Sequence, residues 1–246
     1  MVDYANVNYS KLTVNDRNPL KRALQNKRLE HGLQELTALP ENYQGKILDF
    51  GAGAGEFCKR ISQLLEKSEI VCYEPSKNLR SQAEENVGSI EQIKVEDSIT
   101  KYPDASFDFI FCLEVFEHLT GEKIEEELLL IKRLAKSNAK IIIGVPNEIY
   151  FAALIKGLLR LKRRYGEVDA RVLNILRASV GFPPRQRPVV LFDGLPYIIR
   201  HMGFDHRKFK KQLQKQFKVL KSYGSPNVSL PLFANFEIYY VCRPSS

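Results

Sequence analysis

The sequence contains few cysteines and no long apolar run. None of its four cysteines forms a C-x-x-C pair, and three lie in apolar segments typical of strands; the four are Cys58, Cys72, Cys112 and Cys242. We expect buried free thiols in a reducing cytosol. No segment reaches the roughly 20 apolar residues that a membrane-spanning helix needs, and the polar N-terminus lacks a signal-peptide core. The sequence therefore predicts a cytoplasmic protein.

The charge of the chain is strongly positive and unevenly distributed. A length of 246 residues suits one α/β domain, or one domain with an insertion. The net charge is +8, and Lys and Arg concentrate at 156–164 and 207–221. This asymmetry suggests an anionic partner, which could be a phosphorylated substrate, a membrane surface or nucleic acid. A basic face that is merely solvated is the alternative.

The most informative segment is 46–55, which reads KILDFGAGAG. A short apolar strand ends at glycines in alternate positions, Gly51, Gly53 and Gly55, and a helix with one apolar face is predicted from 56 to 66. Such a strand–glycine turn–helix lets the backbone of an α/β fold contact a ligand. A dinucleotide site has the pattern G-x-G-x-x-G, but Glu56 occupies its third glycine position. This departure argues against a nicotinamide dehydrogenase.

Strands and helices alternate along most of the chain. Strands are predicted at 46–50, 69–73, 92–95, 107–113 and 140–145, with helices at 56–66, 76–87 and 123–135 between them, which indicates a parallel sheet with right-handed crossovers. Residues 147–200 break this rhythm with predicted helices at 149–164 and 169–180 and a loop at 181–188. This block is too short for a core of its own and is interpreted as an insertion. A helix at 204–216 and strands at 217–223 and 236–243 complete the pattern.

Three motifs resemble those of class I S-adenosylmethionine-dependent methyltransferases. The glycine turn preceded by Asp49 resembles the first motif of this family, and Val71-Cys-Tyr-Glu74-Pro-Ser resembles the second. The segment Glu114-Val-Phe-Glu117-His118-Leu119 resembles the motif that follows the fourth strand in small-molecule and sugar-type members. The resemblance implies a Rossmann-like α/β fold with a seven-stranded, mostly parallel sheet, an antiparallel last strand, helices on both faces and a helical insertion after strand five.

The resemblance also implies one methyltransferase domain over residues 1–246. We expect a helical extension at 1–45, a cofactor-binding core at 46–146, a helical insertion or lid on the substrate side at 147–204, and the last helix and closing strands at 205–246. S-adenosylmethionine is the expected cofactor. Glu74 follows strand two, where an acid can accept hydrogen bonds from both ribose hydroxyls, and Asp97 follows strand three, where family members contact the adenine amino group. The expected cofactor-binding residues are Asp49, Gly51, Ala52, Gly53, Gly55, Glu74, Pro75, Asp97, Ser98, Leu113 and Glu114.

The motif after strand four carries the candidate catalytic residues. His118 or Glu117 could act as a general base on an acceptor hydroxyl, and His201, in a segment that covers the acceptor site in glycan-linked relatives, is a second candidate base. Alternatively, Glu114, Glu117 and His118 could bind a divalent metal, with His201 or His206 as a further ligand. A structural role, capping the helix near Gly121, is the remaining alternative.

The sequence restricts the acceptor without naming it. The Asn/Asp-Pro-Pro-aromatic loop and the Pro-Cys pair of nucleic-acid methyltransferases are absent, so we expect a small-molecule or glycan- or lipid-linked sugar acceptor, methylated at a hydroxyl. The basic amphipathic segment 148–164 can lie on an anionic membrane or pack on its own domain. A catalytically inactive, cofactor-binding regulatory protein is the alternative function, although the glycines and the ribose acid are intact.

Overall fold

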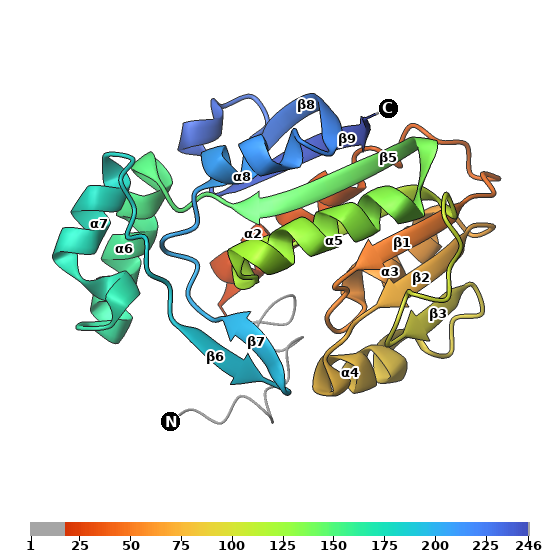
Figure 1. Cartoon of the computed structure of the whole chain (residues 1–246), viewed down its shortest axis with the longest axis horizontal. Coiled ribbons are helices and arrows are strands. Elements are labelled where there is room, and N and C mark those ends of the chain that lie inside the picture. Colours follow the sequence, from red (N-terminus) through yellow and green to blue (C-terminus); the bar gives the residue numbers. More distant parts are fainter. Residues whose placement is uncertain (1–17, 246) are drawn as a thin grey trace.

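The computed structural model describes residues 18–245 (Figure 1). None of the helices in this range is long and apolar enough to cross a membrane. The main sheet has the strand order β3-β2-β1-β4-β5-β9-β8, in which β9 runs antiparallel to both of its neighbours and the other pairs are parallel. Its strands are β1 (Lys46–Phe50), β2 (Glu69–Tyr73), β3 (Ile93–Glu96), β4 (Phe107–Leu113), β5 (Ala135–Pro146), β8 (Phe217–Ser225) and β9 (Glu237–Pro244). The predicted α/β fold is thus confirmed.

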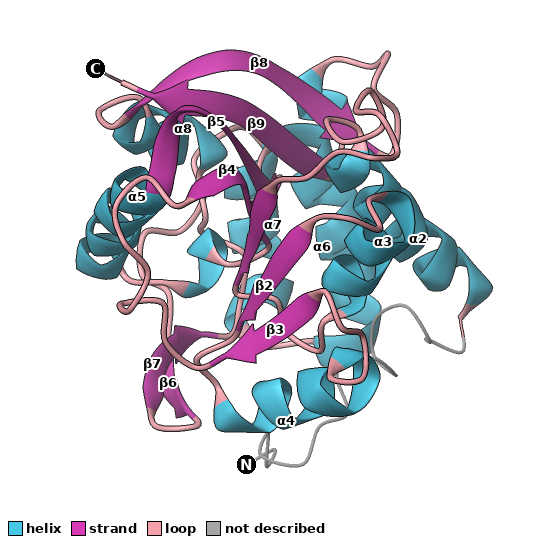
Figure 2. Cartoon of the chain, turned by 90° about the vertical axis from the view of Figure 1, so that its right-hand side faces the viewer, coloured by secondary structure: helices cyan, strands magenta, loops and turns pink. Residues whose placement is uncertain are grey.

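Helices cover both faces of this sheet (Figures 1 and 2). One core cluster joins the sheet to α5 (Gly121–Leu134) and α8 (His206–Leu213). The other joins it to α2 (Pro19–Leu33), α3 (Glu56–Leu64) and α4 (Lys77–Val87). Strands between two such layers need apolar residues on both faces, which explains the continuous apolar runs at β1, β4 and β5.

The segment between β5 and α8 contains more structure than the sequence predicted. It forms α6 (Tyr150–Arg164), a 3-10 turn η3 (Val168–Ala170) and α7 (Val172–Ser179). A two-stranded hairpin follows, β6 (Val189–Phe192) and β7 (Leu195–Ile198), which the sequence-based interpretation missed. Its turn is Asp193-Gly194, and both residues have positive φ, 50° and 80°. An Asp-Gly pair between apolar runs is a strong hairpin signal.

The carboxyl ends of the parallel strands meet at one edge of the sheet. The glycine turn follows β1, Glu74 follows β2, and the 3-10 turn η2 (Phe116–His118) follows β4. A further 3-10 turn, η4 (Leu232–Ala234), precedes β9. Ligands of open α/β sheets bind outside these carboxyl ends, so this edge is where a site is sought.

Candidate active site

A cavity of about 1210 Å³, counting the space open to solvent, lies at this edge of the sheet. The glycine turn, α2 and the β6–β7 hairpin all contribute to its walls. Gly51 and Gly55 have φ values of 76° and 77°, which L-residues with side chains rarely adopt. At Gly51, a Cβ would also lie 2.5 Å from a methyl carbon of Val115. Glycine is therefore required where the turn passes beneath the η2 segment.

Glu74 is held rigidly at the cavity wall. Its Oε2 accepts a hydrogen bond from the Gly53 amide at 2.8 Å, and its Oε1 accepts one from the Ser76 amide at 2.9 Å. The residue is 5% exposed. Burial raises the pKa of Glu74 to about 7, against the opposing effect of the two backbone donors. The carboxylate is thus fixed in orientation, and its oxygens retain capacity for further donors.

A second carboxyl, Asp49, lies at the base of the same cavity. It is buried, its Oδ2 accepts a hydrogen bond from the Cys58 thiol at 3.2 Å, and burial raises its pKa to about 7. Cys58 and the other three cysteines are buried free thiols.

Most of the expected cofactor-binding residues line this cavity. Those that do are Asp49, Gly51, Ala52, Gly53, Glu74, Pro75, Leu113 and Glu114. Gly55, Asp97 and Ser98 are not among the lining residues. Asp97 is exposed, and the Ser98 hydroxyl shares a hydrogen bond with the Thr100 hydroxyl at 2.9 Å. A contact from the Asp97–Ser98 pair to a cofactor stays a prediction.

Glu114 takes part in a buried charge cluster that the sequence did not reveal. Arg28 of α2 donates to Glu114 at 3.0 Å and lies 3.7 Å from Glu237 of β9. Burial is the largest single effect and would raise the pKa of Glu114, but Arg28, a hydrogen bond with Glu237, and more distant His201 and Lys156 together lower the value to about 2. Burial and the neighbouring Glu114 raise the pKa of Glu237 well above its ordinary value. Glu114 is therefore the ionised member of the two carboxyls. Arg28 and Glu237 lie far from the motif in sequence, and no local pattern marks them.

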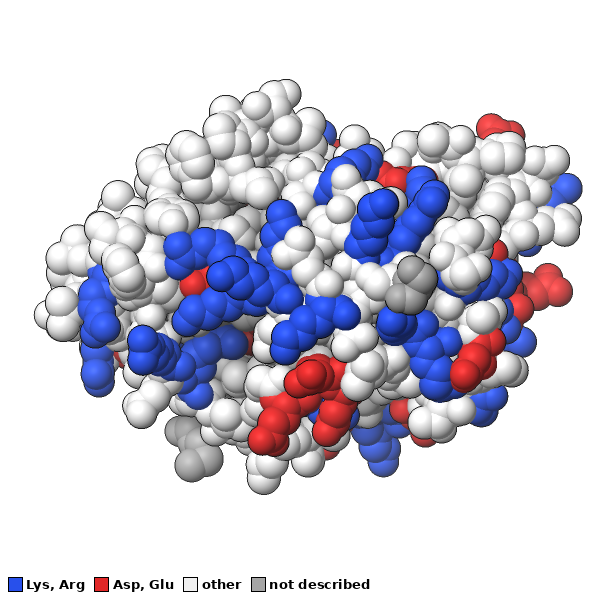
Figure 3. All heavy atoms as spheres, turned by 45° about the horizontal axis from the view of Figure 1, so that its top comes forward, with Lys and Arg blue, Asp and Glu red and all other residues white. Residues whose placement is uncertain are grey.

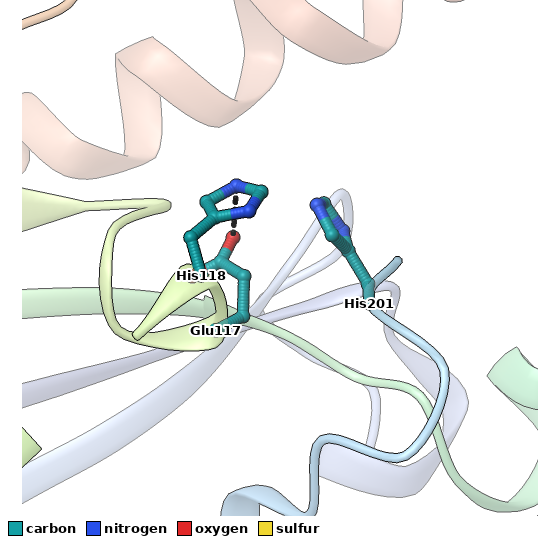
Figure 4. Close-up of side chains that lie close together, drawn as sticks. All are labelled: Glu117, His118 and His201. Carbon is teal, nitrogen blue, oxygen red and sulfur yellow. Dashed lines mark ion pairs between the residues drawn. The ribbon is translucent and has the colours of Figure 1, made fainter. Parts of the chain in front are cut away.

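The three candidate catalytic residues lie together (Figure 4). His118 lines the cavity, its ring meets that of His201 edge to face at 4.8 Å between centroids, and its Nε2 lies 3.8 Å from Glu117 Oε1. The last distance is longer than a hydrogen bond. His118 Nδ1 is 2.8 Å from the Ile198 carbonyl oxygen. Because a carbonyl can only accept, Nδ1 carries the proton and Nε2 keeps its lone pair.

Burial determines the protonation of this cluster. It lowers the pKa of His118 to about 4 and that of His201 to about 3, the latter with a contribution from the neighbouring His118. Both imidazoles are therefore neutral near pH 7. Glu117 is fully buried, and neither carboxyl oxygen has a hydrogen-bond partner among the described residues. Burial, reinforced by Glu114, raises its pKa well above the ordinary value.

The same cluster has the donors for a metal ion. One ligand atom each from Glu117, His118 and His201 lies within 4.8 Å of the others. Imidazole and carboxylate donors suit several divalent ions. Glu114 is instead paired with Arg28, and His206 contacts the Tyr240 hydroxyl at 3.1 Å. A metal at this cluster would have to displace the Glu117 proton.

Part of the chain matches a known protein family. Residues 48–143 match the family model described as a methyltransferase domain. An uncharacterised methyltransferase of Oceanobacillus iheyensis is 28% identical to this chain over 126 residues, which cover 50% of this chain and 57% of that relative.

Solved structures with little sequence identity share the fold. A protein of Pyrococcus horikoshii superposes with a TM-score of 0.62 at 17% identity, covering 97% of this chain and 99% of its own. An S-adenosylmethionine-dependent methyltransferase of Aquifex aeolicus superposes with a TM-score of 0.56 at 17% identity, covering 92% and 97%. The cavity suits S-adenosylmethionine, the cofactor expected from the sequence motifs, because backbone amides, an oriented carboxyl at Glu74 and apolar walls from Leu79 and Leu113 adjoin one another.

Proposed function

We propose that the protein transfers a methyl group from S-adenosylmethionine to a hydroxyl of a small-molecule or lipid-linked sugar acceptor. The arrangement of His118 supports this proposal most directly. Its Nδ1 proton is engaged by the Ile198 carbonyl, its ring is neutral near pH 7, and it lines the cofactor cavity. A neutral imidazole with one fixed tautomer is suited to remove a proton from a hydroxyl. An amine or carboxylate acceptor would need no such base.

Different residues around the cavity orient the cofactor and remove the proton of the acceptor in such a reaction. When bound, S-adenosylmethionine supplies a methyl group on a positively charged sulfur that leaves as a neutral thioether, so no acid is required. Glu74 orients the ribose, and His118 Nε2 accepts the hydroxyl proton as the oxygen–carbon bond forms. Alignment of the two reactants contributes most of the rate acceleration, about 7–11 kcal/mol for well-placed groups. His201 is the weaker candidate base, because it is not among the residues that line the cavity.

The exposed side chains of the helical insertion favour an acceptor that is held at an anionic membrane. Apolar side chains on its outer surface are more than half exposed, among them Leu158 at 54%, Leu173 at 66% and Phe182 at 71%. Lys162 and Arg171 on the same insertion are exposed as well. Apolar side chains flanked by cations are typical of surfaces that bind anionic lipid. We infer that this surface contacts the membrane from which a lipid-linked acceptor reaches the site.

The basic segment 207–221 extends the positive surface. It holds seven Lys and Arg and no Asp or Glu. Lys and Arg side chains spread over the face of the molecule that carries α8, with smaller acidic groups between them (Figure 3). Cations near an anionic bilayer contribute about 1 kcal/mol each, so these side chains add to the electrostatic attraction between the protein and such a membrane.

Radiolabelled S-adenosylmethionine tests the proposed reaction. The protein is incubated with the labelled donor and with aqueous and lipid fractions of a cell lysate. We expect label in a lipid-linked or small sugar as a methyl ether. His118→Asn should lower turnover about 10²- to 10⁴-fold, the usual contribution of a general base, while cofactor binding persists.

The labelled product also separates the alternatives. A methylated amine would refute the hydroxyl acceptor. Binding of S-adenosylhomocysteine without any labelled product would favour the inactive regulatory protein, an alternative that neither the comparisons nor the described residues favour at present.

A further inference from the structure

The β6–β7 hairpin covers the cofactor cavity and belongs to no other sheet. Within residues 18–245 its strands pair only with each other, and Phe192, Pro196 and Tyr197 line the cavity. The hairpin extends from the side of the insertion toward α4 (Figures 1 and 2). An isolated two-stranded hairpin is marginally stable in water. Its position therefore depends on the contacts that its turn and its inner side chains make with the rest of the domain.

The turn of the hairpin is tied to the first residues of α4. Asp193 Oδ2 accepts hydrogen bonds from the Ser76 hydroxyl and the Asn78 amide, both at 3.0 Å. The amides at the start of a helix carry partial positive charge, which favours a carboxylate there. Consistently, these donors lower the pKa of Asp193. The Ser76 amide also holds the Glu74 carboxyl, so the turn is fixed to the segment that contacts the ribose.

The other end of the hairpin positions His118. The Ile198 carbonyl, at the end of β7, accepts the Nδ1 proton of His118. The preceding residue, Tyr197, stacks on the imidazole with 4.3 Å between ring centroids and 13° between planes. One short hairpin thus contacts the ribose-binding segment through its turn and the candidate base through its last two residues.

We propose that residues 189–198 form a lid that opens for cofactor exchange and that its closure positions the base. Asp193 latches the closed lid to α4, and Tyr197 and Ile198 are the positioning residues for His118. With the lid open, His118 has no carbonyl to fix its tautomer and no aromatic ring to shield it from water. A productive base then forms only when the cavity is covered. This inference rests on the proposed role of His118 and on the cofactor assigned to the cavity.

Removing the latch tests the lid without touching the base. Asp193→Gly is the chosen variant, because glycine adopts the positive φ of this turn without strain and a Gly-Gly pair still forms a tight hairpin. Asp104→Gly is the matched control, since Asp104 is an exposed loop aspartate paired with Arg133 at 2.9 Å, remote from the cavity lining. Release of labelled S-adenosylhomocysteine is followed after a chase with unlabelled ligand.

Two readouts report on the two parts of the proposal. We expect Asp193→Gly to release S-adenosylhomocysteine about tenfold faster than the wild type, which corresponds to the loss of one or two net hydrogen bonds. We also expect NMR of the His118 ring nitrogens to show a mixture of tautomers in place of the single Nδ1–H form, because the Ile198 carbonyl no longer holds that proton. Asp104→Gly should change neither quantity.

Either unchanged readout would overturn a part of the proposal. Release at the wild-type rate in Asp193→Gly would show that the turn does not latch the cavity. Faster release with the Nδ1–H tautomer of His118 unchanged would show that closure does not position the base. If the wild-type protein failed to bind S-adenosylhomocysteine at all, both the proposed function and the proposed lid would be refuted. Wild-type binding with an unaltered variant would refute the lid alone.

Discussion

Replacing Glu74 with Gln should weaken cofactor binding, because the variant loses the charge of the carboxylate and turns one of its two acceptor atoms into a donor. The carboxylate accepts one hydrogen bond from the backbone on each oxygen, so the ribose hydroxyls would add donors to an acceptor that is already oriented. Hydrogen bonds to a charged group contribute about 1.5–3 kcal/mol, against about 0.5–1.5 kcal/mol for neutral pairs. Two weakened bonds amount to about 2 kcal/mol. The dissociation constant for S-adenosylhomocysteine should therefore rise roughly 30-fold.

Isothermal calorimetry at about pH 8 measures this difference, because Glu74 is then largely ionised, its pKa being about 7. Glu69→Gln is the matched control, since Glu69 begins the same strand and its carboxylate pairs with Lys46 at 2.9 Å. A dissociation constant within about twofold of the wild type in a folded Glu74→Gln protein would refute the ribose contact.

The same carboxyl predicts how binding depends on pH. Its folded-state pKa is raised to about 7, so the ligand-free protein carries a proton there below that pH. A cofactor hydroxyl prefers the ionised form, and binding must then release the proton. The affinity of the wild type should fall by up to about tenfold per pH unit below 7. In Glu74→Gln the slope should shrink to the contribution of Asp49, whose pKa is also about 7; an unaltered slope would assign the proton elsewhere.

Three further outcomes are expected. The turnover number at saturating substrates should show no inflection near pH 6.5, because burial lowers the pKa of His118 to about 4; an inflection near 6.5 would indicate a solvated base. A divalent ion bound at the Glu117 cluster should release about one proton, seen by calorimetry in buffers of different ionisation enthalpy, and Glu117→Gln should abolish the release; a heat independent of buffer would contradict this. The double variant Leu173→Ser and Leu176→Ser should weaken binding to anionic vesicles at least tenfold, since each leucine buried in the bilayer contributes about 1.5–3 kcal/mol. The control is Leu129→Ser on α5, where the leucine is 48% exposed. Equal binding by all variants would exclude the insertion as the membrane contact.

The strands of the sheet could be predicted closely from local pattern. The predicted bounds of β1, β2 and β4 agree with the structure, because strands covered on both faces are apolar throughout and are bounded by charged or turn residues. The start of α4 was also predictable, since Ser76 caps it and accepts from the Leu79 amide. Predicted helix ends were less accurate: α3 ends at Leu64, and α8 begins at His206.

The hairpin was missed because Pro188 and Pro196 flank or interrupt its strands, and proline usually argues against a strand. Pro196 is tolerated because β7 pairs with β6 on one side alone, which makes it an edge strand among the described residues. The Asp-Gly turn was the available signal. Arg28 and Glu237, by contrast, carry no local signal, because their pairing with Glu114 arises from the docking of α2 and β9 against β4.

The positions of these missed residues bear on where acceptor specificity resides. The methyltransferase family match covers 48–143 and includes the glycine turn, Glu74 and His118. Arg28, the hairpin and Glu237 lie outside it, yet Arg28 and the hairpin line the same cavity and Arg28 bridges Glu114 and Glu237. The match therefore supplies the glycine turn, the ribose acid and the candidate base, whereas α2 and the hairpin add cavity walls from outside it. We expect substitutions in the insertion that do not line the cavity, such as those on α7, to change which acceptor is methylated more than they change cofactor affinity.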